Sequence, residues 1–517
     1  IKTNRGTALF ECGNNHFHMK FHLFKYRLRL TDSSFKYLWI PHPLCCQTNS
    51  LEEFYAGSGI LVTGATGFVG VGLVEKLMRL CPRFTAIFIL IRPKTNETIE
   101  QRFKKLIDNP VRKYDTSFLQ YLIYPVKGDV SLPDLGLSRE DRNLLLEKVN
   151  IVFHAAATVR FNEPLHVAVN VNTKGTARII ELWNELKSPI SFVHVSTAYS
   201  NANLHEIEEK VYTTSLSPSE VIDMCDKFHK TSINQIEKQI LKTYPNTYTF
   251  SKNLAEQIVA SKCKDLPVAI VRPSIIGASL EEPCPGWIQN ISALTIVRGR
   301  KDARLNVVPL DFVVDVIICT AWHVSLHPEH EVKVYNCTSN ANPFRWGQLR
   351  QLVLKYSREM PMNDTLWYPG CPMIANKYIF NILSIIPYVM PAFVIDTFLR
   401  LRGSKPMIMK LLKNSNKLFV SVTHFTMNEW TFQRDNCSDL GRKVKMLNDS
   451  DMVKVDLRDM NWDKYVATYL MGIKKFILKE DFNSIAQQRL SRLYWIHQVT
   501  KICGIIILLW IILCFIY

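Results

Sequence analysis

Residues 60–70 read ILVTGATGFVG, in which Gly64, Gly67 and Gly70 recur at every third position behind an apolar run. The aliphatic residues before the first glycine are typical of a strand buried in a parallel sheet. The residues after the last glycine keep the spacing of a helix up to Leu80. Glycines let the backbone approach a pyrophosphate, and the free N–H groups and dipole of a helix N-terminus attract it. The stretch predicts a strand–turn–helix unit that binds a nucleotide.

Apolar runs of strand length recur after the glycine loop, at 85–94, 121–130, 149–161 and 191–201. Helical patterns lie between them, which predicts a Rossmann-type doubly wound parallel sheet. The first run ends at Arg92 and Lys94, where an NAD site usually carries an acidic residue for the ribose hydroxyls. Cations at this position favour the 2′-phosphate of NADPH, and two solvated loop charges are the alternative.

Four polar residues further along the chain suggest the chemistry. Ser196 and Thr197 end the run at 191–201, and Tyr248 and Lys252 are four apart in a predicted helix over 245–262, so they share a helical face. Tyrosine ordinarily keeps its proton to about pH 10. A neighbouring ammonium group, together with a cationic nicotinamide ring, is expected to lower that pKa. The tyrosine would then donate its proton to a carbonyl oxygen that the Ser196 or Thr197 hydroxyl holds.

Composition narrows the class of protein. The chain has 517 residues, of which 47% are hydrophobic and 21% charged, which predicts more than one domain with ample core. The net charge of +17 suits phosphorylated substrates or an anionic membrane surface, and we expect no nucleic-acid partner because the basic residues are scattered and no nucleic-acid-binding motif accompanies them. The 13 cysteines include no C-x-x-C pair, which indicates a reducing compartment and no metal site.

The C-terminal residues 501–517, KICGIIILLWIILCFIY, carry one charge, at their start. They predict a transmembrane helix over 498–517, with Tyr494 and Trp495 at the interface and the basic residues before it placing the main body in the cytosol. A buried terminal hairpin or a shallow membrane anchor is the alternative. A second apolar stretch, 378–395, contains two prolines and favours a core or membrane-touching hairpin.

Taken together, these residues resemble the extended short-chain dehydrogenase/reductases and, more closely, the alcohol-forming fatty acyl-CoA reductases. The motifs that carry the resemblance run in order over 51–290, and a weaker match continues through 311–500; they are EFYAGSGILVTGATGFVG, ILIRPK, VFHAAATVRFNEPL, NVNTKGT, FVHVSTAYSN, YTFSKNLAE, VRPSIIGAS and EEPCPGW. The resemblance implies a membrane-associated enzyme that reduces long-chain fatty acyl-CoA to a primary alcohol. It also implies two NADPH per acyl group and a bound aldehyde or thiohemiacetal.

The resemblance also implies a division of the chain. Residues 51–335 would form the NAD(P)-binding, Rossmann-type α/β reductase domain, 336–490 a mainly helical, sterile-type C-terminal domain, and 498–517 the C-terminal membrane helix. Residues 1–50 match nothing and form an N-terminal extension. The catalytic domain would face the cytosol at the endoplasmic reticulum or the peroxisome, with the lipid bilayer and long-chain fatty acyl-CoA as its partners.

Site residues follow from the same resemblance. Asp129 matches the adenine-side aspartate, and Asn172 matches the asparagine that supports the lysine through water. Thr197 matches the catalytic hydroxyl, with Ser196 as the alternative. Together with the small residues that end the 149–161 run, the cofactor-binding set comprises Gly64, Thr66, Gly67, Phe68, Gly70, Arg92, Asp129, Ala155, Asn172, Tyr248, Lys252, Pro273 and Ser274.

Two other functions fit parts of this pattern. A membrane-bound steroid or sugar-nucleotide dehydrogenase of the same superfamily would share the glycine loop and the Tyr–Lys pair. A non-catalytic, membrane-tethered homologue would keep the fold and lose turnover. The segment 281–315 is shorter than we expect for the family. Because this segment helps to wall the substrate pocket in the wider superfamily, its shortness would favour the non-catalytic alternative.

Overall fold

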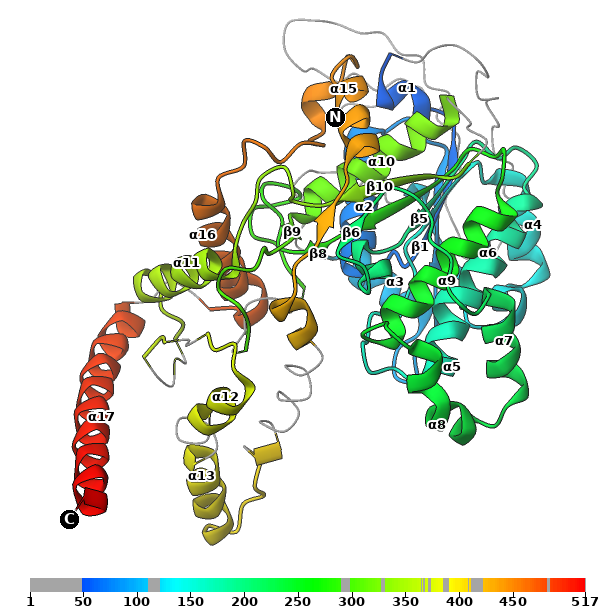
Figure 1. The fold of residues 1–517 in the computed structure, drawn as a ribbon. Coiled ribbons are helices and arrows are strands. Elements are labelled where there is room, and N and C mark those ends of the chain that lie inside the picture. The colour runs from blue at the N-terminus through cyan, green and yellow to red at the C-terminus, as the bar shows by residue number, and fades with distance from the viewer. Residues whose placement is uncertain are drawn as a thin grey trace, which may run out of the picture. The chain divides into compact units, whose positions relative to one another are not determined.

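The computed structural model describes residues 49–109, 121–289, 298–326, 331–363, 365, 368–370, 373–384, 390–407, 409–410, 422–480 and 484–516. Here seven strands form a parallel sheet in the order β10-β7-β5-β4-β1-β2-β3 (Figure 1). They are β1 (Gly59–Thr63), β2 (Ala86–Ile91), β3 (Ile123–Lys127), β4 (Ile151–His154), β5 (Ser191–Val195), β7 (Val268–Pro273) and β10 (Lys333–Cys337). This confirms the predicted Rossmann-type sheet.

The order of the strands fixes the place of the site. The chain runs outward from β1 to β2 and β3, then returns to place β4 on the opposite side of β1. Thr63 at the end of β1 therefore pairs with Leu90 of β2 on one side and with His154 of β4 on the other. In open parallel sheets, ligands bind beyond the carboxyl ends of the strands where the order reverses. The ends of β1 and β4 mark that position here.

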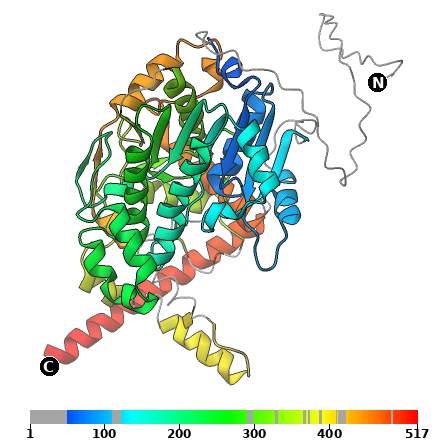
Figure 2. The same cartoon turned by 90° about the vertical axis from the view of Figure 1, so that its right-hand side faces the viewer.

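Helices cover both faces of the sheet (Figure 1 and Figure 2). Ile60 and Val62 of β1 pack in one hydrophobic cluster with α2 (Phe68–Leu80) and α10 (Leu310–Leu326). Leu61, which points to the opposite face, packs in a second cluster with α4 (Arg139–Lys148), α6 (Gly175–Asn184) and α9 (Thr247–Lys262). Because both faces are buried, the strands are apolar at nearly every position, and this explains the unbroken apolar runs of the sequence.

The rest of the described chain is mainly helical, as predicted for its C-terminal part. The other α-helices are α1 (Leu51–Tyr55), α3 (Ile99–Ile107), α5 (Leu165–Ala168), α7 (Pro218–Lys227), α8 (Lys230–Leu241), α11 (Trp346–Glu359), α12 (Lys377–Ser384), α13 (Met390–Leu401), α15 (Asp435–Val444), α16 (Trp462–Gly472) and α17 (Ser484–Ile516). Two short parallel pairs complete the strands, β6 (Glu206–Ile207) with β11 (Thr431–Phe432) and β8 (Ile275–Ile276) with β9 (Val307–Val308).

Helix α17 spans most of the segment 498–517 that the sequence predicts as a transmembrane helix. In the part of the chain that the structure describes, no helix combines the length and the apolar character needed to cross a bilayer. The predicted transmembrane helix is therefore not supported. Residues 1–48 of the predicted N-terminal extension and residues 290–297 of the short 281–315 segment lie outside the described residues.

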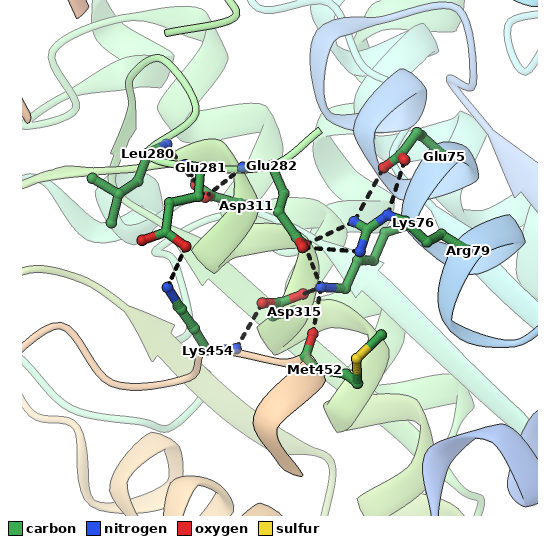
Figure 3. Close-up of polar contacts among 10 residues, drawn as sticks. All are labelled: Glu75, Lys76, Arg79, Leu280, Glu281, Glu282, Asp311, Asp315, Met452 and Lys454. Carbon is green, nitrogen blue, oxygen red and sulfur yellow. Dashed lines mark hydrogen bonds and ion pairs between the residues drawn. The ribbon is translucent and has the colours of Figure 1, made fainter. Parts of the chain in front are cut away.

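A buried network of charges joins α2 to distant parts of the chain (Figure 3). The Lys76 side chain is 3% exposed, and its Nζ lies 2.6 Å from Glu282 Oε2 and 3.1 Å from Asp315 Oδ1. It also donates a 2.6 Å hydrogen bond to the Met452 carbonyl. Arg79, one turn further along α2, donates to both carboxylate oxygens of Glu282, at 2.9 and 2.7 Å. The helix that follows the glycine loop is thus fixed to α10 and to the C-terminal part.

Asp311, in the first turn of α10, holds the segment that leads into this network. Its carboxylate accepts hydrogen bonds from the backbone N–H groups of Leu280, Glu281 and Glu282, at 3.0, 2.8 and 3.2 Å. Burial raises the pKa of Asp311, and these three hydrogen bonds act in the opposite direction because they favour the charged form. Buried charges of this kind are tolerated because each has several polar partners.

We expect Lys76→Met to lower the free energy of unfolding by about 3 kcal/mol, because the substitution leaves the Asp315 carboxylate buried without its cation. Burial raises the pKa of Asp315 to about 7. That value holds for the intact protein, and loss of the Lys76 charge raises the pKa of Asp315 further. At pH 6 the carboxyl group is mainly neutral with or without Lys76, whereas at pH 8 the intact protein gains a paired carboxylate that the variant lacks, so the loss should be larger at pH 8 than at pH 6. Urea unfolding at both pH values measures it. The control is Lys454→Met, which removes an ion pair with Glu281 that is more than half exposed on both sides and should change stability by less than about 1 kcal/mol. Equal losses for the two variants would contradict the assignment.

Candidate functional site

The glycine loop after β1 turns sharply beneath the end of β4. Gly64 has a φ of +73°, a conformation that favours glycine. A Cβ at Gly64 would lie 2.8 Å from the carbonyl carbon of Ala155, and one at Gly70 would lie 2.3 Å from the Gly64 oxygen. Gly67 is the N-cap of α2, so the free N–H groups of the helix lie directly after the turn. The loop therefore presents backbone donors to an anion, as predicted.

Two arginines converge beside this loop. Arg102 of α3 donates a 2.7 Å hydrogen bond to the Thr66 hydroxyl and a second one to the Arg92 carbonyl. Burial lowers the pKa of Arg102, and the charge of Arg92 lowers it further. The two positive charges repel each other, so an anion near both guanidinium groups would be favoured here. The loop, the end of β2 and the start of α3 thus form one anion-binding corner.

Arg102 is a site residue that the sequence analysis missed. Its signal is the capping box that Thr98 and Gln101 form at the start of α3, which places Arg102 in the first helical turn, next to the end of β2. Lys94, the other cation considered at this position, pairs instead with Glu97 through backbone hydrogen bonds. The structure therefore brings Arg92 together with Arg102 rather than with Lys94.

Asp129 lies beside the same corner, after β3. Its carboxylate lies 3.8 Å from Arg92 Nε and is 15% exposed. One of its oxygens accepts hydrogen bonds from the backbone and hydroxyl groups of Ser131, at 2.9 and 2.8 Å, which fix the turn after β3. The structure thus places Asp129 next to Arg92, and its role on the adenine side stays a prediction.

Helix α9 carries the predicted catalytic pair. Asn246 caps it by accepting a 2.9 Å hydrogen bond from the Thr249 N–H. Lys252 is 2% exposed, and its Nζ donates a 2.7 Å hydrogen bond to the Val195 carbonyl at the end of β5. Tyr248, one turn earlier, lies close enough to the Thr197 hydroxyl for that hydroxyl to lower its pKa. The tyrosine, the lysine and the threonine therefore meet beyond the ends of the central strands.

The electrostatics of this pair differ from the prediction. Burial raises the pKa of Tyr248 to about 12, against the opposing effect of its hydrogen bond with Thr197. The charge of Lys252 is not among the causes of that shift. Burial lowers the pKa of Lys252 to about 8, and Glu256 acts in the opposite direction. The predicted lowering of the tyrosine pKa by the lysine is therefore wrong for the protein by itself, because desolvation is the larger effect.

The two candidate hydroxyls have different partners. Ser196 donates a 2.5 Å hydrogen bond to Glu256 Oε1, and both residues are buried. Glu256 also forms a fully buried ion pair with Arg272, with an N–O distance of 2.6 Å. Ser196 is thus engaged in a structural network, while Thr197 is the hydroxyl that contacts Tyr248. The geometry favours Thr197 as the catalytic hydroxyl and leaves Ser196 with a supporting position.

Asn172 lies in a π-helical turn, Val169–Lys174, that packs against α9. Its amide donates to the Thr158 carbonyl and to the Ser251 hydroxyl, at 3.1 and 3.0 Å. The side chain therefore contacts the residue before Lys252 rather than Lys252 itself. Support of the lysine through water stays a prediction.

Pro273 and Ser274 lie at the end of β7, beside β5. The Ser274 hydroxyl is buried and has no hydrogen-bond partner among the described residues. An unpaired buried hydroxyl at the strand ends fits a polar group of a bound molecule. With the glycine turn and the paired arginines, the residues fit a dinucleotide that runs from the anion-binding corner to Tyr248. The fold and these residues together suit an enzyme that binds a dinucleotide.

Comparison with known proteins identifies the family. The NAD-binding domain described as Male sterility protein matches residues 62–317, and the Sterile domain of the same description matches residues 387–480. Fatty acyl-CoA reductase 1 of Mus musculus is 34% identical over 463 residues, which cover 86% of this chain and 90% of the relative. Fatty acyl-CoA reductase 2 of Homo sapiens is 33% identical over 467 residues, covering 87% and 90%. The chain belongs to the fatty acyl-CoA reductase family and is a reductase.

Solved structures support the fold alone. The reductase domain of a nonribosomal peptide synthetase from Mycobacterium tuberculosis superposes with a TM-score of 0.52 at 17% identity, covering 81% of this chain and 92% of that one. The terminal reductase domain of the myxalamid biosynthetic pathway gives 0.51 at 21% identity, covering 80% and 90%.

The two hydroxyls are separable by mutation. We expect Thr197→Val to lower kcat about 100-fold, because it removes a donor to the reacting oxygen. Ser196→Ala should change kcat much less and lower the free energy of unfolding by about 1 kcal/mol, because Glu256 loses a hydrogen bond. Carbonyl reduction and urea unfolding of both purified variants measure the difference. A larger loss of kcat in Ser196→Ala would reverse the assignment.

Proposed function

We propose that this protein reduces long-chain fatty acyl-CoA to a primary fatty alcohol with NADPH and releases CoA by way of an aldehyde-level intermediate. The observation that carries the proposal is the meeting of Tyr248, Thr197 and Lys252 at the ends of the central strands. This arrangement occurs in a chain that is one third identical to fatty acyl-CoA reductases over most of its length.

The preference for NADPH rests on the anion-binding corner. Arg92 and Arg102 lie where the ribose end of a dinucleotide passes the end of β2, and Thr66 joins them to the glycine loop. A 2′-phosphate at this place would neutralise the two guanidinium groups through charge-assisted hydrogen bonds. An NAD site would need an acidic residue there for the ribose hydroxyls.

The chain's own residues would perform the acid–base part of the reaction. Two NADPH molecules, bound one after the other, would each supply one hydride, the first for reduction of the thioester and the second for reduction of the aldehyde. Thr197 and Tyr248 would hold the carbonyl oxygen of the thioester, and Tyr248 would donate its proton to that oxygen. Cleavage of the carbon–sulfur bond then releases CoA as the thiol and leaves the aldehyde. Tyr248 would protonate the oxygen again in the second reduction, after Lys252 has helped to restore its proton.

We also propose contact with a lipid bilayer through α17. Long-chain alcohols are insoluble in water, so a nearby bilayer would accept the product. Trp495, Val499 and Ile502 of this helix are more than half exposed. Large apolar side chains exposed along one helix favour contact with lipid, and Lys501 among them suits an anionic surface.

The first experiment is NADPH oxidation by membranes that contain the full chain, with palmitoyl-CoA and stearoyl-CoA as substrates and chromatographic separation of the lipid products. We expect fatty alcohol and the consumption of two NADPH per acyl-CoA. Tyr248→Phe should abolish alcohol formation and keep NADPH binding, because only the proton donor is lost. Tyr244→Phe, at a partly buried tyrosine just before α9, is the matched control and should stay active.

The other outcomes separate the alternatives. Aldehyde as the end product would limit the enzyme to one reduction. Turnover of a hydroxysteroid or a sugar nucleotide in place of acyl-CoA would assign the chain to a different branch of its superfamily. NADPH binding by the folded wild-type chain without any turnover would make it a non-catalytic homologue.

Arg102→Ala tests the cofactor preference. We expect NADPH affinity to fall roughly tenfold or more and NADH affinity to stay nearly unchanged, because the lost hydrogen bonds are to the phosphate that only NADPH carries. Fluorescence titration of the purified protein with each cofactor measures both values. The control is Lys104→Ala, an exposed cation on the same helix. A parallel loss of both cofactors would place the phosphate contact elsewhere.

A further inference from the structure

A buried histidine touches the catalytic lysine from behind. His194 lies in β5 and has no exposed surface, and its Nε2 is 3.3 Å from Lys252 Nζ. Its other ring nitrogen, Nδ1, is buried and has no hydrogen-bond partner among the described residues. Polar atoms buried without a partner are rare in proteins, and each one needs a structural or functional reason.

The contact fixes the state of the imidazole ring. Burial lowers the pKa of His194 well below its usual value, and the charges of Lys252 and His154 lower it further, so the ring is neutral. A neutral imidazole has one donor nitrogen and one acceptor nitrogen. Because the ammonium group of Lys252 only donates, Nε2 is the acceptor and the proton lies on Nδ1. The tautomer that accepts a hydrogen bond from Lys252 is therefore the one whose Nδ1–H has no partner among the described residues.

The donors of the lysine can be counted in the same way. An ammonium group carries three N–H bonds. One is donated to the Val195 carbonyl at 2.7 Å and one to His194 Nε2 at 3.3 Å. This leaves a single N–H for the side of the site where Tyr248 and a cofactor ribose would lie. Both acceptors belong to β5, so the strand determines where Nζ lies.

We infer that His194 is a positioning residue for the reduction, which accepts a hydrogen bond from Lys252 and thereby orients and stabilises its ammonium group. The inference rests on the proposed function of the same site. According to this inference, β5 supports the lysine directly, whereas Asn172 contacts the neighbouring Ser251.

His154 provides a matched control. It pairs with His194 in the register of β4 and β5, and the two ring centroids are 5.3 Å apart. It is equally buried, but its two ring nitrogens bond the hydroxyls of Thr63 and Thr176, at 2.8 and 3.0 Å. Substitution of either histidine disturbs the same layer of the core, and only His194 bonds the lysine.

The expected signature is a shift in pH dependence. The titratable groups that face Lys252 are His194 and His154 from the sheet and Tyr248 and Glu256 on its own helix. An acceptor to the ammonium group favours the charged form, so its removal should lower the pKa of Lys252, which is about 8 in the intact protein. If turnover needs the charged lysine, the rate is lost as pH rises through that value, and the loss should begin at lower pH without His194.

The experiment compares His194→Leu and His154→Leu in the full chain, by kcat against pH with saturating NADPH and palmitoyl-CoA. We expect the alkaline limb of His194→Leu to move down by about one pH unit and its kcat at pH 7.5 to fall roughly tenfold, with NADPH affinity nearly unchanged. His154→Leu should keep the wild-type limb. If His194→Leu does not fold, His194→Gln and His194→Asn replace it, because only the longer amide reaches Nζ as an acceptor. The inference would be overturned if the alkaline limb of the kcat–pH profile did not move in His194→Leu, or if it moved equally in His154→Leu. It would also be overturned if the Gln and Asn variants had the same alkaline limb.

A second readout requires no substrate and separates this inference from the proposed function. Nitrogen-15 NMR of histidine-labelled protein, with His194 assigned by its loss in His194→Gln, should show a neutral ring with an unprotonated Nε2. Lys252→Met should shift that resonance much more than the resonances of His154, which feels the lysine charge without bonding it. If the His194 resonance does not shift in Lys252→Met, the contact is refuted, even if the wild-type enzyme makes fatty alcohol.

Discussion

The close approach of two backbones at the end of β1 is the constraint on which the rest of the site depends. Gly64 turns with a positive φ directly beneath Ala155, where no side chain fits. That turn places the start of α2 beyond the ends of β1 and β4, where the strand order reverses and where ligands bind in open parallel sheets. The two arginines lie beside the loop itself, and Lys252 bonds the end of β5 on the far side of β4.

The sequence predicts those parts of the molecule that depend on local spacing. The glycine loop, the buried strands and the four-residue separation of Tyr248 and Lys252 are short-range patterns, and the structure places them as expected. The choice between Ser196 and Thr197 was open in the sequence, because adjacent residues on a strand end differ only in the direction of their side chains. Glu256, which lies 60 residues later and binds Ser196, favours Thr197.

Other features depend on contacts between distant segments. In the sequence, nothing marks Arg102 or His194 as a site residue. Arg102 reaches the glycine loop only because α3 packs beside that loop, and His194 reaches Lys252 only because α9 packs beside β5. The ion pair of Lys76 with Glu282 joins residues 206 positions apart, and no spacing rule indicates it. The raised pKa of Tyr248 has the same origin, because desolvation is set by everything that covers a residue rather than by its neighbours in sequence.

The pairing of β11 with β6 has a consequence for the order of biosynthesis. Trp430 donates a hydrogen bond to the Ala202 carbonyl, 228 residues earlier, and packs with Phe425 and with Tyr199, two residues after Thr197. A ribosome that has made the whole sheet has therefore not yet made the aromatic cluster that covers the end of β5. During that interval the nascent enzyme exposes an apolar surface beside its reaction centre, and it would depend on chaperones until the C-terminal part emerges.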